Sequence, residues 1–317
     1  MRSPEYAFEE PLVELRRRIE ELEAYPEGSG HRKEIGRLEK ELLRQTRQVY
    51  HGLSRWQKTL VARHDERPHT LDYVGELMED WVEIHGDRSF ADDPAIVSGF
   101  ARFQGRTVAV IGHEKGRGTK ERIRRNFGQP RPEGYRKALR VMRLAEKFGR
   151  PVLTFIDTPG AYPGIGAEER GQAEAIARNL IEMAALKVPI IATVTGEGGS
   201  GGALALGVGN RVFVLEYATY SVISPEGCAA ILWKDQARKE EAAEALRLSA
   251  PDLLDLGVVD GVIDEPLGGA HTDKAETCRR VGKAVEEALG ELEGKSPAQL
   301  IAERGSKFRA LGVFESE

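Results

Sequence analysis

The segment from Thr195 to Ala203 constrains the fold of this chain most, because five of its seven central residues are glycine. It follows an apolar run, Pro189 to Val194, that predicts a buried strand, and it leads into a short apolar segment that predicts a helix. Glycine allows main-chain N–H groups to approach a ligand without intervening side chains, and such donors at the start of a helix suit an oxyanion or a phosphate. The sequence therefore predicts a strand, an anion-binding turn and a helix in succession.

Further apolar runs place this unit in an α/β domain. Pro151 to Ile156 and Arg211 to Tyr217 have the composition of strands buried on both faces, and Glu168 to Leu186 has helical spacing. Ahead of them, Ala95 to Phe103 and Arg106 to Gly112 alternate on either side of a glycine turn, which predicts a β-hairpin. Strands and helices interleaved in this way favour an α/β core.

Helical spacing among dense charge dominates both ends of the chain. We expect a helical hairpin at Leu12 to Leu22 and Ile35 to Val49, broken at residues 26–30, that serves as a packing or dimerisation arm. We expect further helices at Leu71 to His85, capped by Thr70, at Gln236 to Leu248 and at Lys274 to Leu292. The chain then divides into an N-terminal helical region at residues 1–85, a core at 86–272 and a C-terminal helical segment at 273–317.

Charge is unevenly distributed along the chain. The formal net charge of −5 argues against a dedicated nucleic-acid or membrane binder. Between Glu114 and Lys147, however, twelve lysines and arginines accompany only four acidic residues, so an anion is expected to dock there. Ligand phosphates, RNA, and a solvated or subunit-facing surface remain open as interpretations of this basic run.

Cysteine usage and hydropathy bear on location and on metals. Cys228 and Cys278 are the only cysteines and form no C-x-x-C pair, which argues against a disulfide framework or a cysteine-based zinc site. The first ten residues do not resemble a signal peptide, and no uninterrupted apolar stretch of about 18 residues occurs. We therefore expect a cytoplasmic protein without a membrane span.

Dinucleotide binding is one interpretation of the glycine segment. Gly196, Gly198 and Gly201 satisfy the G-x-G-x-x-G pattern, and Glu216 ends the next strand. Against this, too few residues separate Gly201 from Arg211 for a crossover helix of usual length.

Three other interpretations compete with it. A serine hydrolase would use Ser200, which lies in a G-x-S-x-G pattern, with His113 or His271 as its base. An oxyanion hole would use main-chain amides and a second loop, residues 157–166, which also follows a strand and contains two prolines. Alternatively, both loops are tight turns without a ligand.

Several long motifs, in order over about residues 8–272, resemble the acetyl-CoA carboxylase carboxyltransferase alpha-subunit family. They are far more specific than the glycine pattern alone. They comprise Ala62 to His64 with Thr70 to Tyr73, Lys120 to Ala138, Ile156 to Gly164, Gly166 to Gln172, Gly196 to Ala203, Tyr220 to Cys228 and Glu265 to His271.

The resemblance implies a crotonase-like fold, a spiral of βα units preceded by the helical hairpin, with residues 86–272 as the carboxyltransferase core. It implies a transferase that moves the carboxyl group from carboxybiotin, held on the biotin carboxyl carrier protein, to acetyl-CoA. The product would be malonyl-CoA for fatty-acid biosynthesis. Biotin would not be attached to this chain, and the nitrogen left after decarboxylation would take the methyl proton, so no side-chain base is required.

The resemblance also implies partners. A beta subunit would complete the site in an α2β2 core and would carry the family's zinc, so no metal is expected here. The biotin carboxyl carrier protein and biotin carboxylase would complete the assembly. A non-catalytic interaction subunit, with all chemistry on the partner, is the alternative class.

The matching positions give candidate site residues. The amides of Gly201 and Gly202 would form the oxyanion hole for the biotin ureido oxygen. The biotin-side pocket would be lined by Gly198, Gly199, Ser224, Pro225, Glu226, Gly227, Ala161 and Tyr162. Candidates for the CoA phosphates are Lys115, Arg117, Lys120, Arg122, Arg124 and Arg125.

Departures from the family pattern are confined to two places. Asp235 to Glu241 is more charged than the family's stretch, and the N-terminal hairpin diverges most. The first affects local helix detail and the second affects oligomer packing. Neither touches the two loops.

Overall fold

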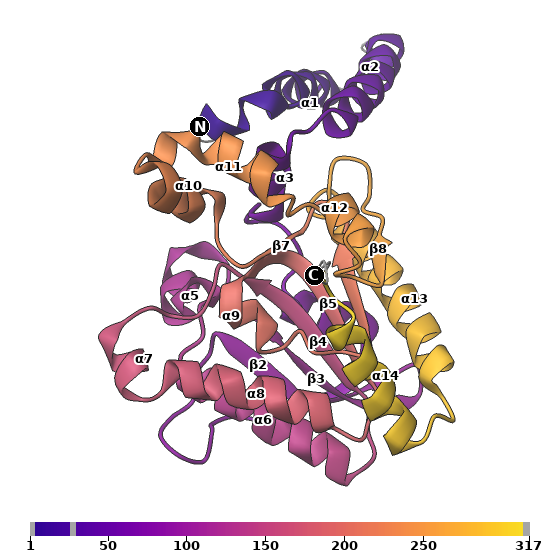
Figure 1. Cartoon of the computed structure of the whole chain (residues 1–317). Helices are drawn as coiled ribbons and strands as arrows, with labels where there is room; N and C mark the ends of the chain where they lie inside the picture. The colour runs from indigo at the N-terminus through magenta and orange to yellow at the C-terminus, as the bar shows by residue number, and fades with distance from the viewer. Residues whose placement is uncertain (1–3, 26–29, 313–317) are drawn as a thin grey trace.

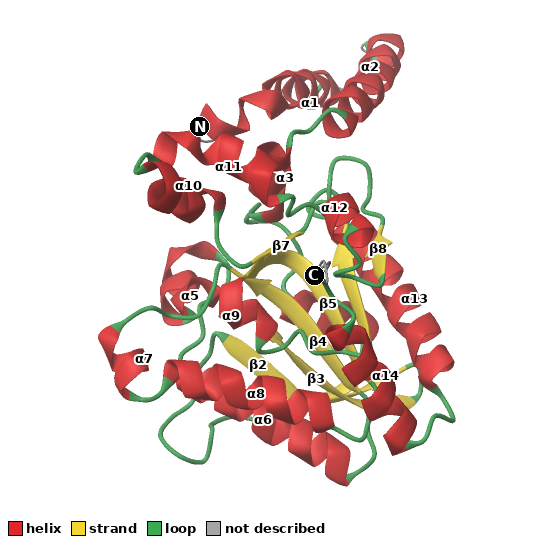
Figure 2. Ribbon diagram, in the orientation of Figure 1, coloured by secondary structure: helices red, strands yellow, loops and turns green. Residues whose placement is uncertain are grey.

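The computed structural model describes residues 4–25 and 30–312. A mixed β-sheet lies at its centre (Figure 2). Within these residues the sheet has eight strands in the order β1-β2-β3-β4-β5-β6-β8, with β7 paired to the end of β5. The strands are β1 (Glu79–Glu83), β2 (Ile96–Phe103), β3 (Arg106–His113), β4 (Val152–Thr158), β5 (Ile190–Gly199), β6 (Arg211–Leu215), β7 (Thr219–Ser221) and β8 (Gly261–Ile263).

Parallel pairing brings the two predicted loops together. β3, β4, β5, β6 and β8 pair in parallel, while β1, β2 and β3 pair antiparallel. Every residue of β4 is buried, as the unbroken apolar run predicts for a strand covered on both faces. Val152 lies opposite Ile190, so β4 and β5 end at the same edge and place residues 157–166 beside the glycine segment. The predicted hairpin of β2 and β3 is confirmed.

Helices surround the sheet and extend beyond it (Figure 1). α6 (Pro132–Lys147) packs on β2 and β3, and α13 (Lys274–Leu292) packs on α4 (Thr70–Leu77), β5 and β8. The predicted hairpin is confirmed as α1 (Glu10–Glu23) and α2 (Arg32–His51), which lie at the opposite end of the molecule from α6 and α8 (Gln172–Ala185) (Figure 1). Most of its predicted break, residues 26–29, lies outside the described residues.

The α-helices are α1 (Glu10–Glu23), α2 (Arg32–His51), α3 (Arg55–Ala62), α4 (Thr70–Leu77), α5 (Gly118–Arg124), α6 (Pro132–Lys147), α7 (Ile165–Glu169), α8 (Gln172–Ala185), α9 (Ser200–Leu204), α10 (Pro225–Trp233), α11 (Lys239–Leu246), α12 (Ala250–Asp255), α13 (Lys274–Leu292) and α14 (Pro297–Arg309). Short 3₁₀ turns occur at η1 (Pro4–Glu9), η2 (Asn126–Gly128) and η3 (Gln236–Arg238).

The predicted helix at residues 71–85 is wrong in its second half. α4 ends at Leu77, and residues 79–83 form the edge strand β1. His69 rather than Thr70 is the N-cap residue, and its main-chain N–H is bonded by Asp72. β1 is held by pairing with β2, a contact distant in sequence that helical periodicity cannot reveal.

Three other helix predictions need smaller corrections. The helix predicted at 168–186 is divided into α7 and α8 by Gly171, whose φ of 81° interrupts helical geometry. The helix predicted at 236–248 starts as a 3₁₀ turn and ends at Leu246. The helix predicted at 274–292 is confirmed as α13, but α14 follows it and was not predicted as a separate helix.

A buried arginine of α14 binds the end of α8 and the segments that lead into β5 and β6. The Arg304 guanidinium donates to the main-chain oxygens of Met183, Leu186 and Val188 and to the Asn210 side chain. It therefore supplies donors to main-chain carbonyls at and just beyond the C-terminus of α8, where a helix lacks its own donors. Residues from α4, α13 and α14 share one apolar core with the sheet, and the boundaries at 85 and 272 stay a prediction.

Candidate functional site

The glycine loop, residues 196–203, is packed directly against the loop that follows β4. A Cβ atom added to Gly202 would lie 2.5 Å from the Ala161 main-chain nitrogen and 2.6 Å from the Gly160 carbonyl carbon. One added to Gly199 would overlap the Pro159 main chain. Only glycine permits this approach, so the two loops predicted to act together form one surface.

Two amides of the glycine loop have no acceptor in the described part of the chain. The Glu197 N–H donates to Asp157 at 2.9 Å, and residues 197–199 pair with β7. Gly201 and Gly202 lie in the first turn of α9, where main-chain N–H groups have no partner within the helix. Of the two, Gly201 lines an open groove, whereas Gly202 is buried beside it.

Charged side chains hold the base of the glycine loop. Lys115 Nζ lies 2.6 Å from Asp157 Oδ1 and 3.2 Å from Glu197 Oε2. On the other side of Glu197, Arg63 Nε lies 2.7 Å from Oε1, and Arg63 Nη1 lies 2.5 Å from Glu226 Oε1. We call these five residues the ion-pair chain.

Burial and ion pairing shift the pKa values of residues in the ion-pair chain in opposite directions. Burial alone would raise the pKa of Asp157, but the Lys115 charge and the Glu197 amide outweigh it and hold the pKa below 3.8. Burial would lower the pKa of Lys115, but Asp157 and Glu197 raise it above 10.5. Both directions keep the pair ionised, so the geometry is fixed at neutral pH.

A second buried pair lies below the loop. The Arg67 guanidinium bonds both Glu265 oxygens, at 2.9 and 2.6 Å, and donates to the Thr195 main-chain oxygen. Glu265 also accepts the main-chain N–H of Tyr217. Arg67 and Glu265 come from two ends of the chain and anchor the residue at which the glycine segment begins.

The predicted biotin-side residues fall into two groups. Gly198, Gly199, Ser224 and Pro225 line one small pocket of about 30 Å³, together with Arg63. The neighbouring residues of α10 support it, because Glu226 binds Arg63 and the Gly227 N–H donates to the Ser224 hydroxyl.

Ala161 and Tyr162 lie on the other side of the glycine loop. The Ala161 nitrogen faces Gly202, and the Tyr162 main chain accepts from Gln172. The Arg131 guanidinium lies 4.8 Å from the centre of the Tyr162 ring, which gives the ring a cation–π partner within the chain.

A larger apolar groove opens beside Gly201. Its volume is about 300 Å³, and its walls come from α9, β7 and α14. Leu204, Val222 and Phe308 line it, and the side chain of Val222 is largely exposed. A flat, uncharged ring could lie there with a polar atom directed at the free amides.

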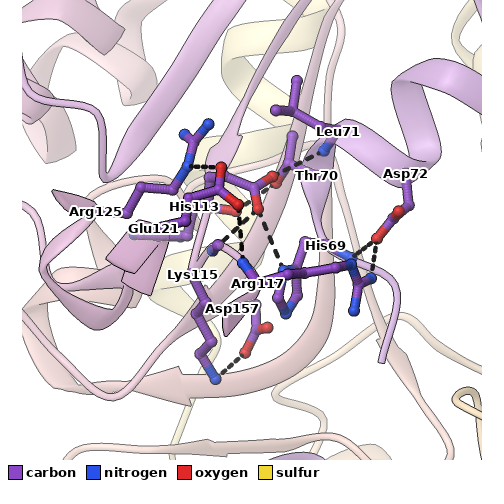
Figure 3. Close-up of polar contacts among 12 residues, drawn as sticks. His69, Thr70, Leu71, Asp72, His113, Lys115, Arg117, Glu121, Arg125 and Asp157 are labelled. Atoms are coloured by element: carbon purple, nitrogen blue, oxygen red, sulfur yellow. Dashed lines mark hydrogen bonds and ion pairs between the residues drawn. The ribbon is translucent and has the colours of Figure 1, made fainter. Parts of the chain in front are cut away.

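The basic run separates into paired and exposed cations. Lys115 points to Asp157, Arg117 binds Asp72, and Arg125 binds Glu121 (Figure 3). Arg122 binds Asp65. Lys120 and Arg124 are exposed, and no ion pair engages them among the described residues. Of the six CoA-phosphate candidates, these two are open to a ligand.

The histidines predicted for a serine hydrolase do not meet Ser200. Ser200 is exposed and has a φ of 52°, but no hydrogen bond joins it to a histidine within the described ranges. His113 is fully buried, which lowers its pKa to about 4, and His271 stacks on His64 at 3.8 Å.

The acidic residue that a dinucleotide site would need, Glu216, is used within the protein. Glu216 accepts the Glu265 main-chain N–H, and α9 is only five residues long. Glu216 is therefore committed to the protein's own main chain.

Sequence reasoning missed the ion-pair chain. Arg63, Asp157 and Glu197 each lay within a noted motif, but they come from separate segments and none was given a role. Acidic residues inside glycine-rich turns at two neighbouring strand ends were the available signal. No group of three or more metal-binding side chains occurs among residues 4–25 and 30–312, and no described helix is long and apolar enough to cross a membrane.

Comparison with known proteins gives strong matches over the whole chain. The family model described as acetyl co-enzyme A carboxylase carboxyltransferase-like matches residues 5–312. The acetyl-coenzyme A carboxylase carboxyl transferase subunit alpha of Syntrophotalea carbinolica is 60% identical over 313 residues, covering 97% of this chain and 98% of its own. The protein of that name from Bordetella pertussis is 58% identical over 317 residues, covering 99% of each chain.

Solved structures support the predicted fold. Transcarboxylase 12S superimposes with a TM-score of 0.58 at 22% identity, over 72% of this chain and 42% of that one. A Pseudomonas malonate decarboxylase hetero-dimer superimposes with a TM-score of 0.55 at 18% identity, over 68% and 89%. These are carboxyltransferase-type folds of the crotonase class, and the predicted fold is confirmed.

Proposed function

Because this chain belongs to the acetyl-CoA carboxylase carboxyltransferase alpha-subunit family, we propose that its glycine loop is the biotin side of a site completed by a beta subunit. The chain is a transferase subunit that takes part in carboxyl transfer to acetyl-CoA, a step of fatty-acid biosynthesis. The observation that supports the site is the unpartnered amide of Gly201 beside an open groove, with the unpartnered amide of the buried Gly202 next to it in the first turn of α9.

The residues suit biotin by shape and by charge. The groove next to Gly201 is apolar, as a largely uncharged ring system requires, and the free N–H groups can bind its polar oxygen. Carboxybiotin supplies the carboxyl group and, once this is lost, a nitrogen able to take the methyl proton.

The amides act at the moment when charge develops. The Gly201 and Gly202 amides would bind the ureido oxygen of biotin, where negative charge would develop as the carboxyl group is given up, and would stabilise the transition state more than the ground state. The packing of Gly202 against Ala161 holds these donors in place before the reaction. No side-chain acid or base of this chain takes part in the proposal.

The remaining parts of the reaction are assigned to partners. The beta subunit would bind acetyl-CoA, stabilise its enolate and carry the zinc, in an α2β2 core. A biotin carboxyl carrier protein would deliver the carboxybiotin made by biotin carboxylase, in the cytoplasm. Lys120 and Arg124 of this chain are proposed to contact the CoA phosphates, since both are exposed and cationic.

Reconstitution tests the proposal. Purified alpha, purified beta and their mixture are each assayed for malonyl-CoA-dependent carboxylation of free biotin. Activity in the mixture and in neither subunit alone is expected. Full activity of beta alone would assign all chemistry to the partner and would leave this chain the interaction subunit considered above.

A further inference from the structure

Arg63 joins the two walls of the small pocket behind the glycine loop. One wall is the glycine loop, which carries Glu197, and the other is the first turn of α10, which carries Glu226. Arg63 Nε lies 2.7 Å from the Glu197 carboxylate, while Nη1 and Nη2 lie 2.5 and 3.2 Å from the two oxygens of Glu226. Arg63 directly follows the last residue of α3, and its side chain lines the pocket together with residues from both walls.

The Arg63 charge neutralises two partly buried carboxylates. Its side chain is three-quarters buried, as the 25% exposure shows, and Glu197 is only 13% exposed. Lys115 already compensates Asp157 and one oxygen of Glu197, so Arg63 is the cation available to the other oxygen and to Glu226. Burial would raise the pKa of Glu226, but the Arg63 hydrogen bonds and charge outweigh it and keep the pKa below 4.5.

The planar guanidinium sets the separation of these walls. Its nitrogens form a rigid fork, so two carboxylates bound on different edges are held at a defined distance. Lysine provides one charged atom on a flexible stem and cannot fix both partners in the same way. The space between these walls, about 30 Å³, is too small for a ring system, so Arg63 acts on the larger groove through the glycine loop, which borders both with residues 198–199 on one side and 200–201 on the other.

We propose that Arg63 is a positioning residue for carboxyl transfer, which holds the glycine loop against α10 and so fixes the loop residues that border the larger groove and set the affinity for the biotin ring. This inference rests on the proposed function of the glycine loop. Arg63 touches no reacting atom in this scheme and acts through Glu197 and Glu226.

The experiment uses the alpha–beta complex in malonyl-CoA-dependent carboxylation of free biotin, with KM measured separately for biotin and malonyl-CoA. The test variants are Arg63→Met, Arg63→Lys and Glu226→Gln. Arg55→Met is the matched control, because Arg55 begins α3 and binds Glu244 and Asp252, away from the glycine loop.

Arg63→Met is expected to raise the KM for biotin about tenfold, the effect of about 1.4 kcal/mol, and to change the KM for malonyl-CoA less than twofold. Arg63→Lys should recover part of the loss. Glu226→Gln should raise the biotin KM in the wild-type background but add little to Arg63→Met, because both changes break one contact. Arg55→Met should leave both KM values unchanged.

Other outcomes overturn the inference. They are a biotin KM within twofold of wild type in Arg63→Met, an equal rise for malonyl-CoA, or the same rise in Arg55→Met. Should Arg63→Met fail to fold, Glu226→Gln and Arg63→Lys decide on the same criteria. An inactive wild-type complex would instead refute the proposed function, and the inference with it.

Discussion

Replacing Gly202 by alanine displaces the proposed oxyanion hole with the smallest possible side chain. The added Cβ would lie 2.5 Å from the Ala161 nitrogen, about 1 Å closer than an ordinary van der Waals contact of about 3.5 Å. The obstacle is main chain, so α9 and the loop after β4 must separate. A misplacement of about 1 Å or the loss of one oxyanion donor costs roughly 10²-fold or more in rate.

Gly201→Ala is the matched control. A Cβ there would meet only the Ile176 side chain, at 3.5 and 3.7 Å, so the amide keeps its position and activity should stay within about threefold of wild type. A larger residue at either position, such as valine, should abolish transcarboxylation while leaving assembly with beta intact.

The assay is kcat for malonyl-CoA-dependent biotin carboxylation by each variant complexed with beta, with assembly checked by size-exclusion chromatography. Gly202→Ala should lose about 100-fold, or about 2.7 kcal/mol of transition-state stabilisation. Wild-type kcat in Gly202→Ala, or an equal loss in Gly201→Ala, would refute the assignment of these amides.

Three further predictions follow from buried and exposed charges. Burial lowers the pKa of His113 to about 4, below the unfolded value of about 6.5, so the stability that its neutral form contributes is present above pH 6.5 and is lost as the pH falls towards 4. Between pH 7 and pH 5, the free energy of unfolding of the wild type, measured with denaturant, should therefore fall by about 2 kcal/mol more than that of His113→Asn, and equal losses would contradict this. Arg304→Met leaves the carbonyls at the end of α8 unpaired and should lower the free energy of unfolding by about 3 kcal/mol, whereas a change below about 1 kcal/mol would show that α14 is held by apolar packing alone. Lys120→Ala with Arg124→Ala should raise the KM for malonyl-CoA about three- to tenfold without changing that for biotin, and an unaltered KM would remove these residues from the CoA site.

The sequence was sufficient for features set by local pattern. The unbroken apolar run of β4, the hairpin of β2 and β3, and the helices α1, α2 and α13 each carry their periodicity within a few turns. The glycine loop and its partner were also found, because two neighbouring parallel strands must end at one edge.

Features set by distant contacts were missed or wrong. β1 was taken as the end of a helix, since its stability comes from pairing with β2 rather than from its own pattern. Lys115 stays a predicted phosphate candidate, but the sequence did not show that its ammonium group lies between Asp157 and Glu197. Spacing along the chain does not show that Arg63 reaches Glu197 across more than a hundred residues.

The amides of Gly201 and Gly202 should both point at the ureido oxygen when biotin is bound. A crystal structure of the alpha–beta complex with biotin measures this directly, through the distances from the ureido oxygen to the main-chain nitrogens of Gly201 and Gly202. The account predicts about 2.7–3.1 Å for both. A ureido oxygen bound by other groups, with these amides directed away from the subunit boundary, would contradict it.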